Sequence, residues 1–397
     1  MFNGKKSTTQ GFALDIGSRE VKMIAYEKTA DTNNLKLLGS GHASINDHSL
    51  EHGRIRDVSD ITQAVNTAYL EAKFDDQKYP VTAGVSGVVI DTVCIEITER
   101  RQQTKKKIKP KEWKEWMQYI IHRLDQEEYH SERQYKVDME MAHSSLEHMT
   151  IDGRSIDHPI KEMGEKMVFD IFTAYAPKDH LDGLKYTTEY IQMPFNGAFH
   201  NQYAVARMVL DYYKYPSPSL ILVDIGDSHT DICLIIEGHI VSILSFSIGG
   251  YSFSQTLMNT FDLSIEEADT LKAEYSQARL PRHITDKITD VLTDDIKLWL
   301  QGFEVALAEI SSHISLPDRV VIYGGGASLL GMKEAIEYGN WYKSIGEQYK
   351  PKVSLFSPRM LAHVIDDTGV LNHPRYIPLL GLIHVGNQHR KDIHLHF

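Results

Sequence analysis

Short apolar runs flank a polar, glycine-containing turn at two places in the chain. The second copy covers residues 222–236 and gathers Asp224, Gly226, Ser228 and Thr230 at or beside its turn. The first copy covers residues 11–25, with Asp15, Gly17 and Ser18 in the same order. Apolar runs that are separated by such a turn predict β-hairpins. One similar hairpin in each half of the chain indicates two related domains that face each other across a cleft.

A third glycine-rich segment follows an apolar strand pattern at residues 319–323. It contains Gly324, Gly325 and Gly326 and opens a helical pattern. Glycine lets a ligand approach the backbone closely, and the start of a helix offers unpaired N–H groups. The two hairpin turns are suited to cradle phosphate oxygens in a similar way. Each element alone also fits an ordinary turn, but the three in this order favour a phosphate ligand.

The rest of the chain shows hydrophobic patterns typical of helices in some segments and of strands in others. Apolar residues recur at helical spacing over residues 58–73, and similar patterns predict helices at 112–124, 179–193, 201–213 and 284–314. Strands are predicted at 35–42, 80–90 and 93–97, and Ser264 with Glu267 forms a capping box. Strands that are followed by helices indicate an α/β protein.

Composition narrows the class of protein. A chain of 397 residues is too long for one simple core and suits two lobes, and its net charge of −12 argues against general binding of nucleic acid. Cys94 and Cys233 lie in apolar strand patterns, so we expect both to be buried and reduced, as in the cytoplasm. Residues 1–10 are polar, and no apolar run is long enough to cross a membrane.

These three glycine segments together resemble the motifs of the actin-like ATPase superfamily, and they match the bacterial cell-division protein family FtsA best. Residues 14–22, 223–231 and 323–331 are similar to the first phosphate, second phosphate and adenosine motifs. A further segment resembles the end of a small subdomain that is inserted in the first lobe of FtsA. It carries Asp152, Gly153, Ile156, Pro159, Met163 and Gly164. The related family is PilM of type IV pilus assembly.

The resemblance implies a two-lobed α/β fold of duplicated RNase H-like domains with a small inserted α+β subdomain of the SHS2 type. The expected first lobe (1A-type) covers residues 1–80 and 163–213, with the insert (1C-type) at 81–162. The expected second lobe (2A-type) covers 214–253 and 316–397, with a helical and sheet subdomain (2B-type) at 254–315.

The resemblance also implies that ATP and Mg bind in the cleft. Asp15 and Asp224 would hold the metal, mostly through water, although both could simply cap turns. The expected phosphate-binding residues are Gly17, Ser18, Lys22, Gly226, Ser228 and Thr230. The expected nucleoside-binding residues are Asp269, Lys272, Gly324, Gly325, Gly326 and Ser328. Asp269 and Lys272 could instead form a surface ion pair.

The residue that would orient an attacking water falls at the start of the helix at 201–213. Asn201 and Gln202 are the two candidates, and a polar helix start without a catalytic role is the favoured interpretation of both. ATP hydrolysis is therefore expected to be slow if it occurs.

Asp227 departs from the FtsA pattern, which has glycine at that place. Two unit charges ~4 Å apart repel by about 4 kcal/mol at a surface-like dielectric, so a carboxylate beside the phosphates should weaken ATP binding. This holds unless Asp227 turns outward or joins the metal shell. Ser254 and Thr256 also differ from the Thr and Asp that the family tends to have.

The resemblance further implies protofilaments at the inner face of the cytoplasmic membrane at the division site. The implied partners are the C-terminal peptide of the division GTPase FtsZ, which would bind the second lobe, and other division proteins, which would bind the insert. Near the C-terminus, Ile393, Leu395 and Phe397 alternate as in a strand, so little of the tail would enter a bilayer. The basic run at residues 105–111 is either a solvated loop or a contact with an acidic partner or anionic lipid.

Two rival functions stay open at this stage. A PilM-type scaffold, which binds a short peptide of an inner-membrane protein, would explain the missing amphipathic tail. A small-molecule kinase with the same fold would need an acidic base in the cleft, for which the sequence offers no distinctive candidate.

Overall fold

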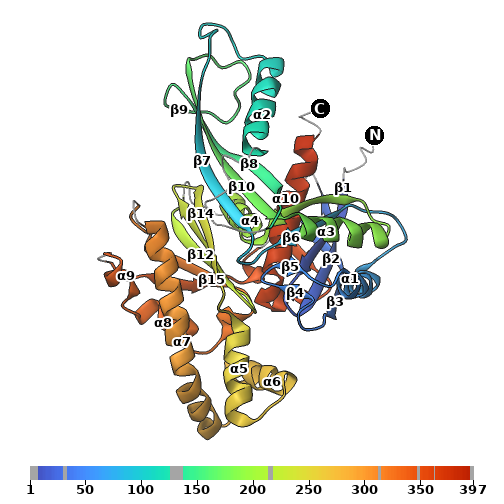
Figure 1. Cartoon of the computed structure of the whole chain (residues 1–397), viewed down its shortest axis with the longest axis vertical. Helices are drawn as coiled ribbons and strands as arrows, with labels where there is room; N and C mark the ends of the chain where they lie inside the picture. The colour runs from blue at the N-terminus through green and yellow to red at the C-terminus, as the bar shows by residue number, and fades with distance from the viewer. Residues whose placement is uncertain are drawn as a thin grey trace, which may run out of the picture.

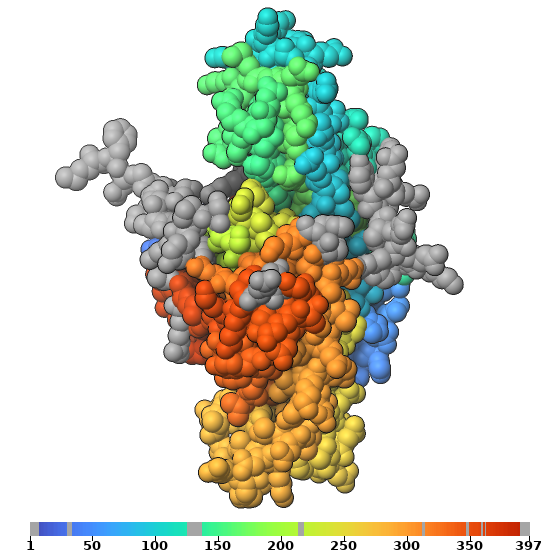
Figure 2. Space-filling model, turned by 90° about the vertical axis from the view of Figure 1, so that its left-hand side faces the viewer, coloured from blue at the N-terminus to red at the C-terminus, as the bar shows by residue number. Residues whose placement is uncertain are grey.

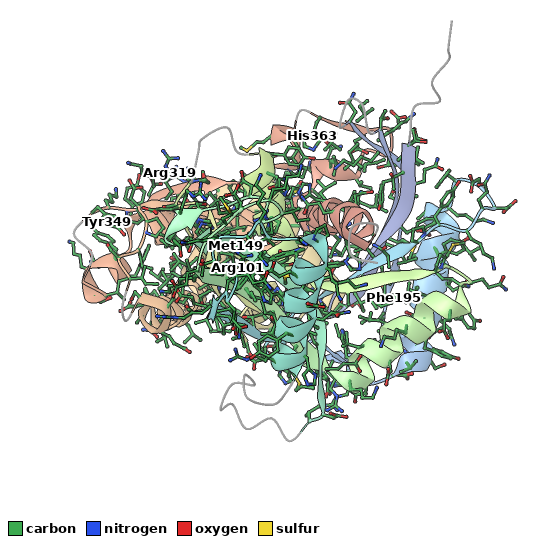
Figure 3. All side chains as sticks on the ribbon, turned by 90° about the horizontal axis from the view of Figure 1, so that it is seen from above. Arg101, Met149, Phe195, Arg319, Tyr349 and His363 are labelled. Atoms are coloured by element: carbon green, nitrogen blue, oxygen red, sulfur yellow. The ribbon has the colours of Figure 1, made fainter. Side chains whose placement is uncertain are left out.

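The computed structural model describes residues 8–29, 34–125, 137–212, 218–311, 314–346, 349–361 and 363–393. Two sheet-centred lobes lie side by side, with a narrow subdomain rising above them and a group of helices projecting below (Figure 1). Seen from above, Phe195 of the first lobe and Arg319 of the second lie on opposite sides of the upper subdomain, which is marked by Arg101 and Met149 (Figure 3).

The first lobe is built on a six-stranded sheet in the order β11-β6-β1-β2-β3-β17. β1 (Thr8–Ile16), β2 (Glu20–Thr29) and β3 (Leu35–Ser44) form the antiparallel part of this sheet. β6 (Val81–Val85) and β11 (Phe195–His200) extend it in parallel on the other side of β1. One face packs against α1 (Val58–Ala72), which the Asp57 side chain caps, and against α3 (Lys178–Tyr190). The other face packs against α4 (Asn201–Tyr212) and α10 (Ile377–Ile393).

The second lobe is built on a five-stranded sheet in the order β14-β13-β12-β15-β16. Its strands are β12 (Leu220–Ile225), β13 (Thr230–Ile236), β14 (His239–Phe246), β15 (Arg319–Tyr323) and β16 (Lys352–Leu355). α7 (Arg282–Ile310), α8 (Met332–Tyr338) and α9 (Trp341–Ser344) pack with one face of this sheet. Short elements complete the two lobes: β4 (Leu50–Glu51), β5 (Arg54–Ile55), and the 3-10 turns Gly326–Ser328, Pro358–Met360, Val370–Asn372 and Pro374–Tyr376.

The lower subdomain consists of α5 (Gly250–Phe261), α6 (Ile265–Ser276) and the first turns of α7. The predicted capping box of Ser264 and Glu267 is present at the start of α6. Residues 254–311 carry no strand in the structure, so the sheet that we expected in this part is not formed there.

The upper subdomain is a separate four-stranded sheet with one helix. Its elements are β7 (Asp91–Arg100), α2 (Pro110–Asp125), β8 (Met139–Ile151), β9 (Arg154–Ser155) and β10 (Lys166–Pro177), with strand order β7-β10-β8-β9. The insert therefore spans about residues 91–177, and the expected boundaries of 81–162 are corrected. The reason is strand pairing, because β6 lies between β11 and β1 in the first lobe, whereas β10 pairs with β7 and β8.

The C-terminal part of the chain returns to the first lobe, which corrects its assignment to the second. β17 (Val364–Asp366) pairs with β3, and α10 packs against α4 and β1. α10 also continues through Ile393, so residues 384–393 are helical and the strand-like alternation expected near the C-terminus is wrong for Ile393. Leu395 and Phe397 lie outside the described residues.

Solvent exposure agrees with the expectation for one cysteine and contradicts it for the other. Cys233 is fully buried in β13, whereas Cys94 is exposed on β7, where only one face of the insert's sheet is covered by α2. In the described ranges, no helix is both long and apolar enough to span a bilayer.

Candidate functional site

The turns of the two predicted hairpins lie against each other between the lobes. In the β1–β2 turn, the Gly17 N–H donates to the Glu20 carbonyl at 2.9 Å. In the β12–β13 turn, the Gly226 N–H donates to the His229 carbonyl at 3.0 Å. These bonds close the two turns, and a hydrogen bond of 2.8 Å from Ser18 Oγ to Asp227 Oδ2 joins them. The sequence thus correctly predicted two facing turns, although these two N–H groups serve the turns themselves.

The aspartate of the first hairpin is neutralised by its own surroundings. Asp15 lies opposite Lys22 in the β1–β2 register, and the Lys22 ammonium approaches Asp15 Oδ2 to 2.7 Å. Asn201 Nδ2, at the start of α4, donates to the other carboxylate oxygen at 2.8 Å. Burial disfavours the charge on Lys22, but the attraction of Asp15 outweighs it and raises the pKa of Lys22.

The aspartate of the second hairpin has the opposite environment. Asp224 lies opposite a second carboxylate, Asp231, in the β12–β13 register. Burial of its carboxyl group, and then repulsion from Asp231, raise the pKa of Asp224 to about 8, although the nearby His229 opposes the shift. Asp231 itself is stabilised as an anion by His229, at 3.5 Å, and by the Ser245 hydroxyl, which lower its pKa against the effect of burial. The charged form of Asp224 is thus disfavoured at this end of the cleft.

The third glycine segment packs directly on the second hairpin. Gly324 has φ of +92°, and a Cβ there would lie 2.2 Å from Asp224 Oδ1. A Cβ at Gly326 would lie 2.5 Å from Ile225 Cγ2, so both glycines are required by this close approach. Gly325 is different, because it is exposed and its Cβ would meet nothing within 4 Å. Gly325 and the partly exposed Ser328 are thus the members of this motif with room for a ligand.

The N-terminus of α5 also meets the second turn. The N–H groups of Gly250 and Tyr251 donate to the carbonyls of Gly226 and Asp227, each at 2.8 Å. Gly249 is needed here, since a Cβ on it would lie 2.5 Å from the Asp227 carbonyl oxygen. The second turn is therefore held in place by helix α5.

Asp227 points across the cleft toward the first lobe. The Arg19 guanidinium, from the β1–β2 turn, donates from Nε to Asp227 Oδ2 at 2.9 Å and from Nη2 to Asp227 Oδ1 at 2.5 Å. Its Nη1 donates to Asp269 Oδ2 on α6 at 2.5 Å. Burial opposes the positive charge of Arg19, but the two carboxylates outweigh it and raise its pKa. Sequence reasoning missed Arg19, because nothing in the sequence shows that two distant aspartates converge on it.

Asp269 and Lys272 do form the ion pair that was left open as an alternative. The Lys272 ammonium lies 3.0 Å from Asp269 Oδ1 and also donates to the Gly250 carbonyl at 2.8 Å. The Ser254 hydroxyl donates to the same Asp269 oxygen at 2.5 Å. Burial would raise the pKa of Asp269, but Arg19, Ser254 and Lys272 lower it.

Thr230 and Gln202 are the most deeply buried of the predicted polar site residues. Thr230 is fully buried, where it donates to the Ile248 carbonyl at 2.7 Å and accepts from Trp299 Nε1 at 2.9 Å. Gln202 is also fully buried, and its Nε2 donates to the Leu222 carbonyl at 2.6 Å while its Oε1 accepts from the Tyr323 hydroxyl. Gln202 therefore joins α4 to the second sheet.

Asn201 is the better placed of the two helix-start candidates. Its amide nitrogen contacts Asp15, and its buried Oδ1 has no hydrogen-bond partner among the described residues. A buried carbonyl oxygen without a partner is suited to accept a hydrogen bond from water. Asn201 is thus able to hold a water molecule beside Asp15.

A polar cavity of about 90 Å³ lies behind the second hairpin, where the insert meets both lobes. Asp91, Thr92, His200 and Ser245 contribute to its lining. Ser245 links the cavity to Asp231, and buried His200 Nε2 has no partner among the described residues. This cavity has the size and polarity to hold a few water molecules.

Comparisons with known proteins agree with this fold. Residues 198–342 match the family model of the type IV pilus assembly protein PilM. The chain is similar to the cell division protein FtsA of Rhizobium meliloti (strain 1021), with 20% identity over 367 residues, which cover 81% of this chain and 77% of that protein.

Solved structures give the same picture. The chain is similar to a structure of the PilM-PilN type IV pilus biogenesis complex, with a TM-score of 0.67 and 15% identity over 95% of this chain and 98% of that one. It is also similar to the ethanolamine utilization protein EutJ from Carboxydothermus hydrogenoformans, with a TM-score of 0.50 and 13% identity over 96% and 90% of the two chains. The distant resemblance to FtsA and PilM and the predicted fold class are confirmed.

Proposed function

This chain has the actin-like ATPase fold, and we propose that it is an FtsA-like scaffold that binds Mg-ATP and assembles into protofilaments. The observation that carries the proposal is the convergence of two Asp-Ile-Gly turns and a glycine segment between two lobes. In this proposal the nucleotide bridges the lobes and fixes their relative position, so that it acts as a switch for subunit contacts.

The residues of the second hairpin fit a hydrated Mg ion. Asp224 shares its end of the cleft with Asp231, and a divalent cation would relieve the repulsion between them. No cluster of three or more His, Cys, Asp or Glu side chains in the described ranges could hold a metal, so Mg would be held largely through water and phosphate. When bound, the metal would neutralise phosphate charge.

Other residues of the site would contact the phosphates, the nucleoside and a water molecule. The turns at Gly17, Ser18, Gly226 and Ser228 would line the phosphates, with Gly325 and Ser328 beside the nucleoside. Lys22 forms an ion pair with Asp15, and Asn201 would hold a water next to it. We do not assign a phosphate contact to Thr230, since its hydroxyl is used inside the protein.

Self-association is supported by the charges at the two ends of the molecule. The insert and helices α5 to α7 lie at opposite ends of the longest axis (Figures 1 and 2). The loop before α2 exposes Lys105, Lys106, Lys107 and Lys109, held in place by the buried Arg101, whose Nη2 donates to the Lys106 carbonyl at 2.9 Å. The opposite end exposes more acidic than basic side chains, with Glu266, Glu267, Glu274, Asp286, Asp290 and Asp294 beside Arg279, Arg282 and Lys287. A basic loop at one end and a partly acidic surface at the other are compatible with head-to-tail stacking.

The partner distinguishes two versions of the proposal. In the FtsA-type version, the second lobe binds the FtsZ C-terminal peptide, the insert binds other division proteins, and the filament lies at the inner face of the cytoplasmic membrane at the division site. In the PilM-type version, the chain is a cytoplasmic scaffold of type IV pilus assembly. The family match over residues 198–342 and the similarity to the PilM-PilN complex support this second version, and the similarity to FtsA over 81% of the chain supports the first.

The test uses the purified full chain with Mg-ATP. Calorimetry measures binding, and sedimentation measures assembly with and without nucleotide, and with an FtsZ tail peptide or a PilN peptide from the same cell. We expect Mg-ATP to bind and to promote pelleting, and one of the two peptides to co-sediment. Failure of the native chain and of the cleft variants described below to bind Mg-ATP would refute the nucleotide switch.

A further inference from the structure

Arg19 connects the two lobes beside the facing turns. Arg19 belongs to the β1–β2 turn of the first lobe, whereas its partners, Asp227 and Asp269, belong to the β12–β13 turn and to helix α6. The Arg19 guanidinium also lies over the ring of Tyr251, 5.4 Å from its centre. All these partners lie in the second lobe or its lower subdomain, so the contact holds the lobes together.

All three nitrogen atoms of the Arg19 guanidinium donate hydrogen bonds in this contact. Three of its nitrogens donate to carboxylate oxygens, two of them to Asp227 in a bidentate pair. The side chains of Arg19 and Asp227 are each about 30% exposed, so the cluster is only partly shielded from water and remains accessible to a ligand. Bidentate, charge-assisted pairs of this kind are among the stronger polar contacts in proteins.

The same groups lie where the proposed function places a nucleotide. Ser18, Asp269 and Lys272 are predicted ligand-binding residues, and all three are engaged in this cluster or beside it. A phosphate group presents the same pattern of acceptor oxygens to a guanidinium as a carboxylate does. A nucleotide phosphate that bound here would compete with Asp227 for Arg19.

We propose that Arg19 is a phosphate-binding residue that exchanges partners: Asp227 and Asp269 hold it and close the cleft without nucleotide, and a nucleotide phosphate takes their place. The closure part stands on the contacts themselves, and the phosphate part rests on the proposed nucleotide function. Asp227 then acts as an internal competitor, so the carboxylate that departs from the family pattern lowers affinity for nucleotide through Arg19 as well as through repulsion.

The proposal predicts opposite effects for two substitutions at the same contact. Asp227→Asn removes the competitor and frees Arg19, so Mg-ATP should bind about 5- to 150-fold more tightly, the usual range for coupled sites. Arg19→Gln leaves two carboxylates facing the phosphates without a cation and should weaken Mg-ATP binding by at least a similar factor. Arg19→Gln removes both ion pairs between the lobes, whereas Asp227→Asn weakens the contact and leaves the Arg19–Asp269 pair.

The experiment measures lobe closure and ligand binding separately. Small-angle X-ray scattering of the nucleotide-free chain should give a larger radius of gyration for both variants than for the native chain. Calorimetry with Mg-ATP should show tighter binding by Asp227→Asn and weaker binding by Arg19→Gln. Circular dichroism confirms that each variant is folded before it is compared.

A matched control is Arg54→Gln. Arg54 makes a similar bidentate pair with Asp179, since both its Nε (3.0 Å to Oδ1) and its Nη2 (to Oδ2) donate to the carboxylate, but both residues lie in the first lobe. This variant should change neither the radius of gyration nor the affinity for Mg-ATP.

The outcomes separate the inference from the proposed function. Unchanged scattering of both folded cleft variants would overturn the closure part, whatever the nucleotide does. A larger radius of gyration of the two variants, combined with equal Mg-ATP affinity of the native chain and both variants, would overturn the phosphate role of Arg19. If none of the chains binds Mg-ATP, the nucleotide function and the phosphate role fail together, and closure is judged by scattering alone.

Discussion

The two hairpins at the cleft share a backbone and a motif but carry opposite charges at one position. Asp15 and Asp224 occupy the same place in their hairpins, each one residue before the end of its strand. The residue opposite Asp15 is Lys22, and the residue opposite Asp224 is Asp231. One motif aspartate is thus neutralised inside the protein, while the other shares its surroundings with a second carboxylate.

This difference shows that one turn motif can serve two electrostatic purposes. In the first hairpin, the Asp15–Lys22 pair is a nearly buried ion pair that belongs to the fold. In the second hairpin, the ionised form of Asp224 is destabilised by burial and by Asp231. Binding of a proton or a metal cation would remove this cost in free energy. The asymmetry predicts different responses when each hairpin is altered in the same way.

The largest effect is expected for Asp15→Asn. The substitution leaves the buried Lys22 ammonium without its carboxylate, and removal of one partner of a buried pair costs about 3–5 kcal/mol. Urea unfolding should show this loss of unfolding free energy. The double variant Asp15→Asn, Lys22→Met should recover part of it, because no unpaired charge remains. A loss below about 1 kcal/mol would mean that the pair is not part of the fold's stability.

Asp224→Asn should have the opposite sign and stabilise the protein without ligand. The pKa of Asp224 is raised from 3.8 to about 8 by burial and Asp231, so the folded chain binds more protons than the unfolded chain between these values. Stability from this group is full below pH 4 and is lost as the pH rises toward 8. Removing the carboxylate should therefore gain roughly 1–3 kcal/mol at pH 8, allowing for the partial exposure of Asp224.

The pH dependence provides the check on that prediction. The difference in unfolding free energy between Asp224→Asn and the native chain should be small at pH 5 and should grow toward pH 8. Asp47→Asn, at an exposed position of the first lobe, should show no such trend. Destabilisation by Asp224→Asn at pH 8 would contradict the difference between the hairpins.

Thr230 and Val21 give a third, smaller contrast. They occupy equivalent positions, since Thr230 is paired with Ile225 and Val21 with Ile16. Thr230→Val leaves Trp299 Nε1 and the Ile248 carbonyl without their partner, at a cost of about 1–3 kcal/mol in thermal or urea unfolding. Mg-ATP affinity of the folded variant should stay the same. A loss of Mg-ATP affinity without a loss of stability would instead indicate that Thr230 contacts the phosphates.

The contrast between the hairpins also marks what sequence patterns could predict. Local patterns were enough for both hairpins, for α1 and α4, and for the capping box at Ser264. Apolar runs around a polar turn, helical spacing and a Ser followed three residues later by Glu all depend on neighbours in sequence. Insert boundaries were wrong because strand pairing between β6 and β1, and between β10 and β7, is not local. Cys94 was wrongly expected to be buried because an apolar pattern does not show which face of a sheet is covered.

The site followed the same rule. The residues of the motifs were found because they are close in sequence, and the structure does bring the two turns together. The pairing of Arg19 with Asp227 joins residues 208 positions apart, and no periodicity links them. The role of Thr230 was missed for the same reason, since Trp299 lies 69 positions away.

The smallest expected effects concern the serines of the two turns. Ser18 Oγ donates across the cleft to Asp227 at 2.8 Å, whereas Ser228 Oγ lies 3.1 Å from Nδ1 of its neighbour His229. Ser18→Ala should lower the unfolding free energy by about 1 kcal/mol, because it removes a hydrogen bond to a charged group that also joins the lobes. Ser228→Ala should stay within about 0.5 kcal/mol of the native chain. Both variants are measured in parallel urea titrations. Equal losses of unfolding free energy would mean that the Ser18 hydrogen bond between the lobes stabilises the protein no more than the local contact of Ser228 with His229.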